Sequence, residues 1–152
     1  MRVPATQSKE ISMERFNRLA HSVWDCKYHI VWIPKYRRKE LYGAKRRIVV
    51  DTIKQWSRMK GIEIIEGHAM PDHIHLCVSI PPKYSVAHTI GLLKGKSASE
   101  VMSFGTKSSR MVRGRTFWAR GYCVSTVGLD EETIREYIRN QEQIDMLQKE
   151  PT

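Results

Sequence analysis

Residues 73–80 alternate polar and apolar side chains so regularly that the pattern constrains the whole fold. His73, His75, Cys77 and Ser79 are each followed by isoleucine, leucine or valine. Successive side chains of a β-strand point to opposite faces, so we expect a strand with its apolar face against a core. A slip of one residue would bring both imidazoles into that core, and the register of the strand is therefore strongly specified.

Strand and helix signals on either side of this segment predict a single α+β domain. In chain order we expect a strand, a helix, two strands, a helix, a strand and a helix, over residues 23–34, 45–60, 62–70, 73–80, 85–102, 116–127 and 130–149. That order is the split βαββαβ arrangement of ferredoxin-like and RRM-like domains, with an antiparallel sheet, helices on one face and an added C-terminal helix. We expect a polar N-terminal arm over residues 1–20 and a single folded domain over residues 21–149.

The charge of the chain indicates a polyanionic partner. Among 152 residues, 26 Lys and Arg outnumber 16 Asp and Glu, which gives a formal net charge of +10. Such a surplus favours nucleic acid through counterion release and long-range steering, although a basic surface without a partner would have the same composition. We expect a cytoplasmic protein without a membrane span, because no stretch approaches roughly 20 apolar residues and the N-terminus shows no signal-peptide pattern.

His73 and His75 form the first candidate site. Two residues apart on a strand, they point to the same face about 6 to 7 Å apart, so both imidazoles can bind one metal ion. Two surface histidines on a half-exposed strand would show the same spacing, and short motifs carry false positives.

Tyr137 and Gln141 form the second candidate site, on the predicted helix over residues 130–149. They are four residues apart and share a helix face beside the apolar stripe of Ile134 and Ile138. A packed tyrosine with its hydroxyl at the edge of the core would also fit. Two imidazoles, a carboxamide and a phenol together suit phosphate chemistry with Mg²⁺ or Mn²⁺, and the imidazoles favour Mn²⁺. The ion would polarise the scissile phosphate, and the phenol of Tyr137 would attack phosphorus.

Five segments of the chain resemble, in sequence and in order, the small single-tyrosine HUH transposases of bacterial and archaeal insertion sequences, often called TnpA. HUH denotes His, a hydrophobic residue and His. The segments cover about residues 24–148 and read YHIVWIPKYRR from Tyr28, GHAMPDHIHLCVSIPP from Gly67, LLKGKSAS from Leu92, and FWARGYCVSTVG followed by EETIREYIRNQE. Any one motif alone would be weak, but five in register make a strong resemblance.

The resemblance implies a role for each candidate residue. His73 and His75 match the HUH metal ligands. Gln141 matches the third protein ligand, and Tyr137 matches the nucleophile. The family nicks single-stranded DNA at hairpin-bearing element ends, leaves a 5′-phosphotyrosine and a free 3′-OH, and rejoins strands without ATP. A phosphotyrosine ester replaces a phosphodiester of similar energy, so the reverse attack needs no external fuel.

The resemblance also implies a homodimer with composite active sites. The sheets of the two subunits merge, and each site combines the histidines of one subunit with the tyrosine helix of the other. Gly128, just before that helix, is then the expected hinge, because glycine tolerates the backbone change that a swing requires. An ordinary strand-to-helix turn would also use glycine. Many members carry a second small residue there, whereas this chain has Leu129.

Basic residues and a tyrosine supply the expected contacts to single-stranded DNA. Lysine and arginine would neutralise phosphates, and Tyr36 and Trp118 offer rings for base stacking, although Trp118 also suits a core position. The candidate DNA-binding residues are Lys35, Tyr36, Arg37, Arg38, Lys39, Lys94, Lys96, Arg110, Arg113, Arg115 and Arg120.

Three rival interpretations share part of this pattern. A non-catalytic RRM-like module for single-stranded nucleic acid has the same element order, but the chain lacks the aromatic K/R-G-F/Y-G/A-F-V-x-F/Y segment. A domesticated relative acting on repeated chromosomal hairpins would share the transposase chemistry. A zinc hydrolase is disfavoured, because no third His, Cys or carboxylate lies at ligand spacing.

Overall fold

The computed structural model describes residues 16–19, 22–37, 39–104 and 117–147. A four-stranded antiparallel sheet forms its centre, with the strand order β4-β5-β3-β6. The strands are β3 (Lys27–Trp32), β4 (Glu63–Met70), β5 (His73–Ser79) and β6 (Cys123–Ser125). The two central strands are the first and third of the four in chain order, which confirms the predicted α+β fold of split βαββαβ type.

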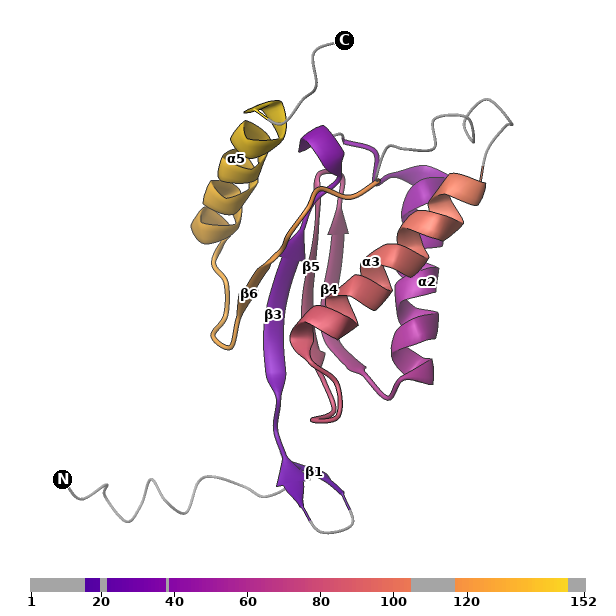
Figure 1. The fold of residues 1–152 in the computed structure, drawn as a ribbon, viewed down its shortest axis with the longest axis vertical. Helices are drawn as coiled ribbons and strands as arrows, with labels where there is room; N and C mark the ends of the chain where they lie inside the picture. The colour runs from indigo at the N-terminus through magenta and orange to yellow at the C-terminus, as the bar shows by residue number, and fades with distance from the viewer. Residues whose placement is uncertain (1–15, 20–21, 38, 105–116, 148–152) are drawn as a thin grey trace, which may run out of the picture.

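Helices lie on both faces of this sheet (Figure 1). The helices α2 (Gly43–Met59) and α3 (Val86–Ser103) pack on one face, and the added helix α5 (Glu131–Leu147) packs on the other. In the part of the chain that the structure describes, no helix has the length and apolar character needed to span a bilayer.

Alternate residues of β3 supply both hydrophobic clusters. Ile30 and Trp32 are fully buried in the main core, under α2 and α3. Val31 points to the opposite face, where it packs with Ile134 and Ile138 of α5 in a smaller cluster. The sheet is therefore covered on both faces at β3, because successive side chains of a strand point in opposite directions.

The residues predicted to cap the starts of the last two helices do so in the structure. The Oγ atom of Ser85 accepts a hydrogen bond of 3.0 Å from the backbone N–H of His88, which caps α3. The Oδ1 atom of Asp130 accepts one of 2.7 Å from the N–H of Thr133 at the start of α5. Two glutamates in the first turn of α5 are favourable at the positive end of the helix dipole.

The predicted strand over residues 23–34 is divided in the structure. Its first two residues form β2 (Val23–Trp24), which pairs with β1 (Asn17–Arg18) in a separate two-stranded sheet. β1 falls within the expected N-terminal arm, of which residues 1–15 and 20 lie outside the described part of the chain. The strand β3 then begins at Lys27.

The predicted strand over residues 116–127 is also shorter than expected. Only β6 pairs with β3, and a single isolated bridge joins Trp118 to Pro34. Gly121 lies between these two pairings with a φ of +82°. A left-handed residue interrupts extended backbone, so the segment cannot continue as one strand.

Candidate active site

His73 and His75 lie on the central strand β5 and face the side of the sheet that carries α5. Ile74 between them is buried in the main core, so the two imidazoles point to the opposite face. His75 pairs with Val31 of β3, which belongs to the cluster under α5. The register predicted from the alternation is the register that the structure has.

His75 is the middle member of a row of three imidazoles across the sheet. Its ring centroid lies 5.9 Å from that of His29 on β3 and 6.0 Å from that of His68 on β4. Sequence reasoning missed His29 and His68, because only the pairing of three separate strands brings them to His75. For His29, the buried neighbour Ile30 was a signal available in the sequence, whereas the neighbours of His68 on β4 are not buried.

The surroundings of His75 favour its neutral form. Burial lowers the pKa of His75, and the nearby rings of His29, His68 and His73 lower it further. Its Nε2 atom is buried and has no hydrogen-bond partner among the described residues. A neutral imidazole with an available nitrogen is the form that binds a metal ion.

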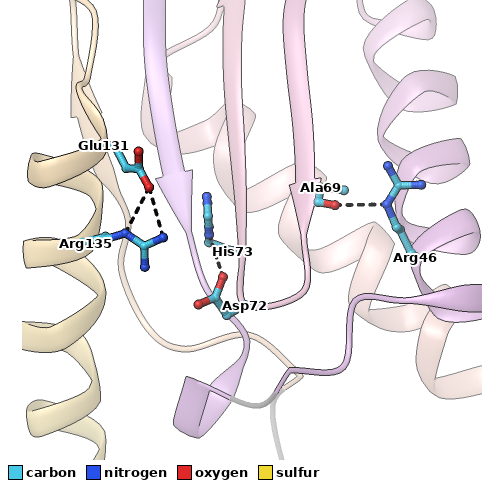
Figure 2. Close-up of polar contacts among 6 residues, drawn as sticks. All are labelled: Arg46, Ala69, Asp72, His73, Glu131 and Arg135. Atoms are coloured by element: carbon cyan, nitrogen blue, oxygen red, sulfur yellow. Dashed lines mark hydrogen bonds and ion pairs between the residues drawn. The ribbon is translucent and has the colours of Figure 1, made fainter.

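His73 has a carboxylate partner. Figure 2 shows its contact with Asp72, in which Nδ1 of His73 lies 2.8 Å from Oδ1 of the carboxylate. Each of the two side chains is 16% exposed. Asp72 belongs to the tight turn that joins β4 to β5, directly before the first residue of β5. The hairpin therefore sets this pair close together.

Tyr137 and Gln141 lie on α5 and face the sheet. Tyr137 is partly buried against a cluster that includes Val31 and Ile33, and Gln141 is 8% exposed. The helix also contacts the short 3-10 turn η2 (Lys35–Arg37). A single chain thus carries both candidate pairs on the same face of the sheet.

The described residues contain no group of three His, Cys, Asp or Glu side chains that could hold a metal ion. A carboxamide oxygen such as that of Gln141 is a suitable donor for Mg²⁺ or Mn²⁺.

Gly128 lies in the exposed connection between β6 and α5. A Cβ atom added to it would meet no atom within 4 Å, and Gly128 is not among the glycines with positive φ. The conformation seen here therefore does not require glycine at this position.

The candidate DNA-binding residues differ in their surroundings. Lys39, Lys96 and Arg120 are exposed. Lys35 and Tyr36 lie in η2 beside α5, with Nζ of Lys35 5.3 Å from the centroid of the Tyr36 ring. The candidates outside the described part of the chain are Arg38, Arg110, Arg113, Arg115 and the side chain of Arg37.

Lys94 makes its polar contacts within the protein. Its Nζ atom donates hydrogen bonds of 2.8 Å to the carbonyl of Ala119 and 2.9 Å to that of Gly121. Trp118, which is 4% exposed, donates from Nε1 to Oγ of Ser97 at 3.0 Å and to the Lys94 carbonyl at 3.1 Å. Burial lowers the pKa of Lys94 to about 8. These contacts attach the segment before β6 to α3, and they give Trp118 a core position.

Comparison with known families identifies the class of protein. Residues 22–141 match the family described as "Transposase IS200 like". The chain belongs to this family. It is therefore a transposase, an enzyme that processes DNA, and the match runs from just before β2 to Gln141 in α5.

Relatives of known name agree with this assignment. The transposase for insertion sequence element IS200 of Salmonella typhimurium is 46% identical over 124 residues, which cover 81% of each chain. The ISDra2 transposase TnpA of Deinococcus radiodurans is 30% identical over 120 residues, which cover 78% of this chain and 86% of the relative.

Solved structures share the fold. A crystal structure of a Deinococcus radiodurans R1 protein described as a transposase superposes with a TM-score of 0.70 and 27% identity, over 82% of this chain and 97% of that one. A REP-associated tyrosine transposase bound to a REP hairpin superposes with a TM-score of 0.51 and 11% identity, over 80% of this chain and 68% of that one.

Proposed function

We propose that the chain is a metal-dependent transposase that nicks and rejoins single-stranded DNA through Tyr137 at hairpin-bearing element ends. The observation that carries this proposal is the shared sheet face: His73 and His75 point to it, and α5 packs Tyr137 and Gln141 against it. Membership of the IS200-like family supports the transposase activity. The hairpin complex of the REP-associated transposase supports hairpin substrates.

His73, His75 and Gln141 are the proposed protein ligands of a Mg²⁺ or Mn²⁺ ion. The residues fit such an ion, because Nε2 of His75 has no partner among the described residues and Asp72 occupies only the Nδ1 side of His73. Two nitrogens and one oxygen leave coordination positions for phosphate oxygens. When bound, the ion would act as a Lewis acid on the scissile phosphate.

Tyr137 is the proposed nucleophile. Its phenolic oxygen forms a bond to phosphorus while the bond between phosphorus and the 3′ oxygen breaks. The phenol loses its proton, and the departing oxygen takes one up to become a free 3′-OH. The 5′-phosphotyrosine keeps the energy of the diester, so another 3′-OH can attack it and rejoin the strands without ATP.

We also propose a homodimer in which each site combines the histidines of one subunit with the Tyr137 helix of the other. Gly128 would act as the hinge of this exchange. The backbone conformation seen here does not require glycine at residue 128, and a second conformation that does require it would explain why glycine is present. The proposed catalytic domain covers residues 21–149, with residues 1–20 as an arm.

The proposed contacts to the DNA backbone lie on both faces of the sheet, because Lys96 belongs to α3, on the face opposite the histidines. Lys35 and Tyr36 lie beside α5, and Lys39, Lys96 and Arg120 are exposed. Lys94 is less suited to a phosphate contact than the exposed cations, because its ammonium already donates hydrogen bonds within the protein. Arg37, Arg38, Arg110, Arg113 and Arg115 stay predictions from the sequence.

The decisive experiment is a covalent-adduct assay with Tyr137→Phe. Wild-type protein, Mn²⁺ and a single strand with a hairpin and a label at its 3′ end should give a labelled protein band on a denaturing gel. Tyr137→Phe should bind the strand with unchanged affinity and give no such band, because phenylalanine lacks the attacking oxygen. Tyr42→Phe is the matched control, since Tyr42 is 68% exposed at the start of α2 and should keep full adduct formation. Adduct formation by Tyr137→Phe would assign the nucleophile to another residue.

A further inference from the structure

The turn between β4 and β5 gives His73 a carboxylate partner, whereas no described residue gives His75 one. Figure 2 shows the contact between the two side chains, with Oδ1 of Asp72 2.8 Å from Nδ1 of His73. Both side chains are mostly buried. The ring neighbours of His75 are the imidazoles of His29 and His68, at 5.9 and 6.0 Å, and its Nε2 has no hydrogen-bond partner among the described residues. The two histidines of β5 are thus held by different means.

The contact with Asp72 determines which nitrogen of His73 carries the hydrogen. An ionised carboxylate can only accept, so the hydrogen between the two groups belongs to Nδ1 of the imidazole. In the neutral ring this leaves the lone pair on Nε2. The same hydrogen bond restricts rotation of the ring about its bond to Cβ.

We propose that Asp72 is a positioning residue for His73, which holds the Nδ1–H tautomer and the ring orientation so that Nε2 is available to the metal ion. This inference rests on the proposed role of His73 as a metal ligand. Carboxylate partners of metal-binding histidines typically change metal affinity by about 10- to 100-fold.

The hairpin has supports that do not involve the Asp72 side chain. Met70 and His73 pair across the end of the β4–β5 ladder. The backbone N–H of Leu41 donates a hydrogen bond of 3.2 Å to the Pro71 carbonyl in the same turn. Removal of the Asp72 carboxylate should therefore leave the turn in place, so that its effect on metal binding can be measured in folded protein.

The neighbouring strand offers a matched control. Oε1 of Glu66 lies 2.8 Å from a ring nitrogen of His68, the same distance as in the Asp72–His73 pair. His68 is not a proposed ligand, and the side chains of Glu66 and His68 are 63% and 50% exposed. Loss of Glu66 removes one negative charge from the same sheet face without touching His73.

The experiment measures binding of Mn²⁺ alone to the full chain, by the electron paramagnetic resonance signal of the free ion. Asp72→Ala should weaken binding by about 10- to 100-fold, and Asp72→Asn by less, because its carbonyl oxygen can still accept from Nδ1–H. Glu66→Ala should weaken binding by less than about fivefold, as expected for an exposed charge. In metal-free protein, ¹⁵N spectra of the imidazoles should show the Nδ1–H tautomer of His73 in the wild type and a mixture in Asp72→Ala.

The outcomes separate this inference from the proposed function. His73→Ala should lose Mn²⁺ binding, and if it does while Asp72→Ala binds like the wild type, the positioning role alone is overturned. Equal losses in Asp72→Ala and Glu66→Ala would also overturn it, since the effect would then be one of charge. Wild-type affinity in His73→Ala would remove the proposed metal site and the positioning role together.

Discussion

Lys94 should make the stability of this transposase rise with pH in a range where most proteins lose stability. Its ammonium is partly buried between α3 and the segment before β6, and burial lowers its pKa from 10.5 to about 8. Below pH 8 the lysine is charged in both the folded and the unfolded state. Between about pH 8 and 10.5 the unfolded chain binds a proton that the folded chain does not, so the free energy of unfolding increases with pH.

The size of the effect follows from the pKa difference. One pKa unit corresponds to about 1.4 kcal/mol, so a fall from 10.5 to about 8 gives an upper value of about 3 kcal/mol. The hydrogen bonds to the carbonyls of Ala119 and Gly121 favour the charged ammonium and reduce this value. Solvent screening of the partly exposed ammonium reduces it further, so we expect an observed rise of about 1 kcal/mol.

The assay compares urea unfolding of the wild type and Lys94→Met at several values between pH 7.5 and 10.5. The difference in free energy of unfolding between the two proteins gives the contribution of Lys94, because the other titrating groups are common to both. Lys96→Met is the matched control, since it removes a lysine from an exposed position of the same helix and should show no such rise relative to the wild type. If the difference in free energy of unfolding between wild type and Lys94→Met stays constant over this range, the ammonium remains charged in the folded protein. That result would contradict the lowered pKa of Lys94.

Two further changes test the hinge and the core position of Trp118. Gly128→Ala should raise the free energy of unfolding by up to about 1 kcal/mol, because no atom lies within 4 Å of the added Cβ. The same change should slow strand rejoining in a gel assay, because alanine restricts the backbone of a connection that must change conformation. An unchanged rejoining rate would count against the hinge. Trp118→Phe should cost about 1 to 3 kcal/mol in thermal unfolding, since Oγ of Ser97 and the Lys94 carbonyl lose their shared donor, while fluorescence anisotropy should show unchanged affinity for single-stranded DNA. Weaker DNA binding by the folded variant would instead favour base stacking on Trp118.

The position of α5 bears on how the proposed active site would be assembled. In one chain the helix already lies on the face of His73 and His75, held by Ile134 and Ile138 in a small cluster apart from the main core. A helix docked through few side chains can move without disturbing the rest of the domain. The proposed exchange of helices between subunits therefore requires this small cluster to open and the connection that contains Gly128 to change conformation.

The sequence predicted the sheet and its orientation because the signals were local. The alternation from His73 to Ile80 specified which face of β5 meets the core, and the structure has that register. The order of the elements was enough to predict the split βαββαβ topology, and Ser85 and Asp130 marked the starts of two helices. Such features depend on neighbours a few residues away, which a single sequence displays directly.

The tertiary structure alone decided which distant side chains meet. The row of His29, His75 and His68 comes from three strands, and the placement of Lys94 against Ala119 comes from a helix and a loop 25 residues later in the chain. The sequence also could not show that the strand before Gly128 is short, because a left-handed backbone at Gly121 is visible only in the fold. Strand register and side-chain packing bring such residues together. Neither of them produces a periodic pattern in the sequence from which the contacts could be predicted.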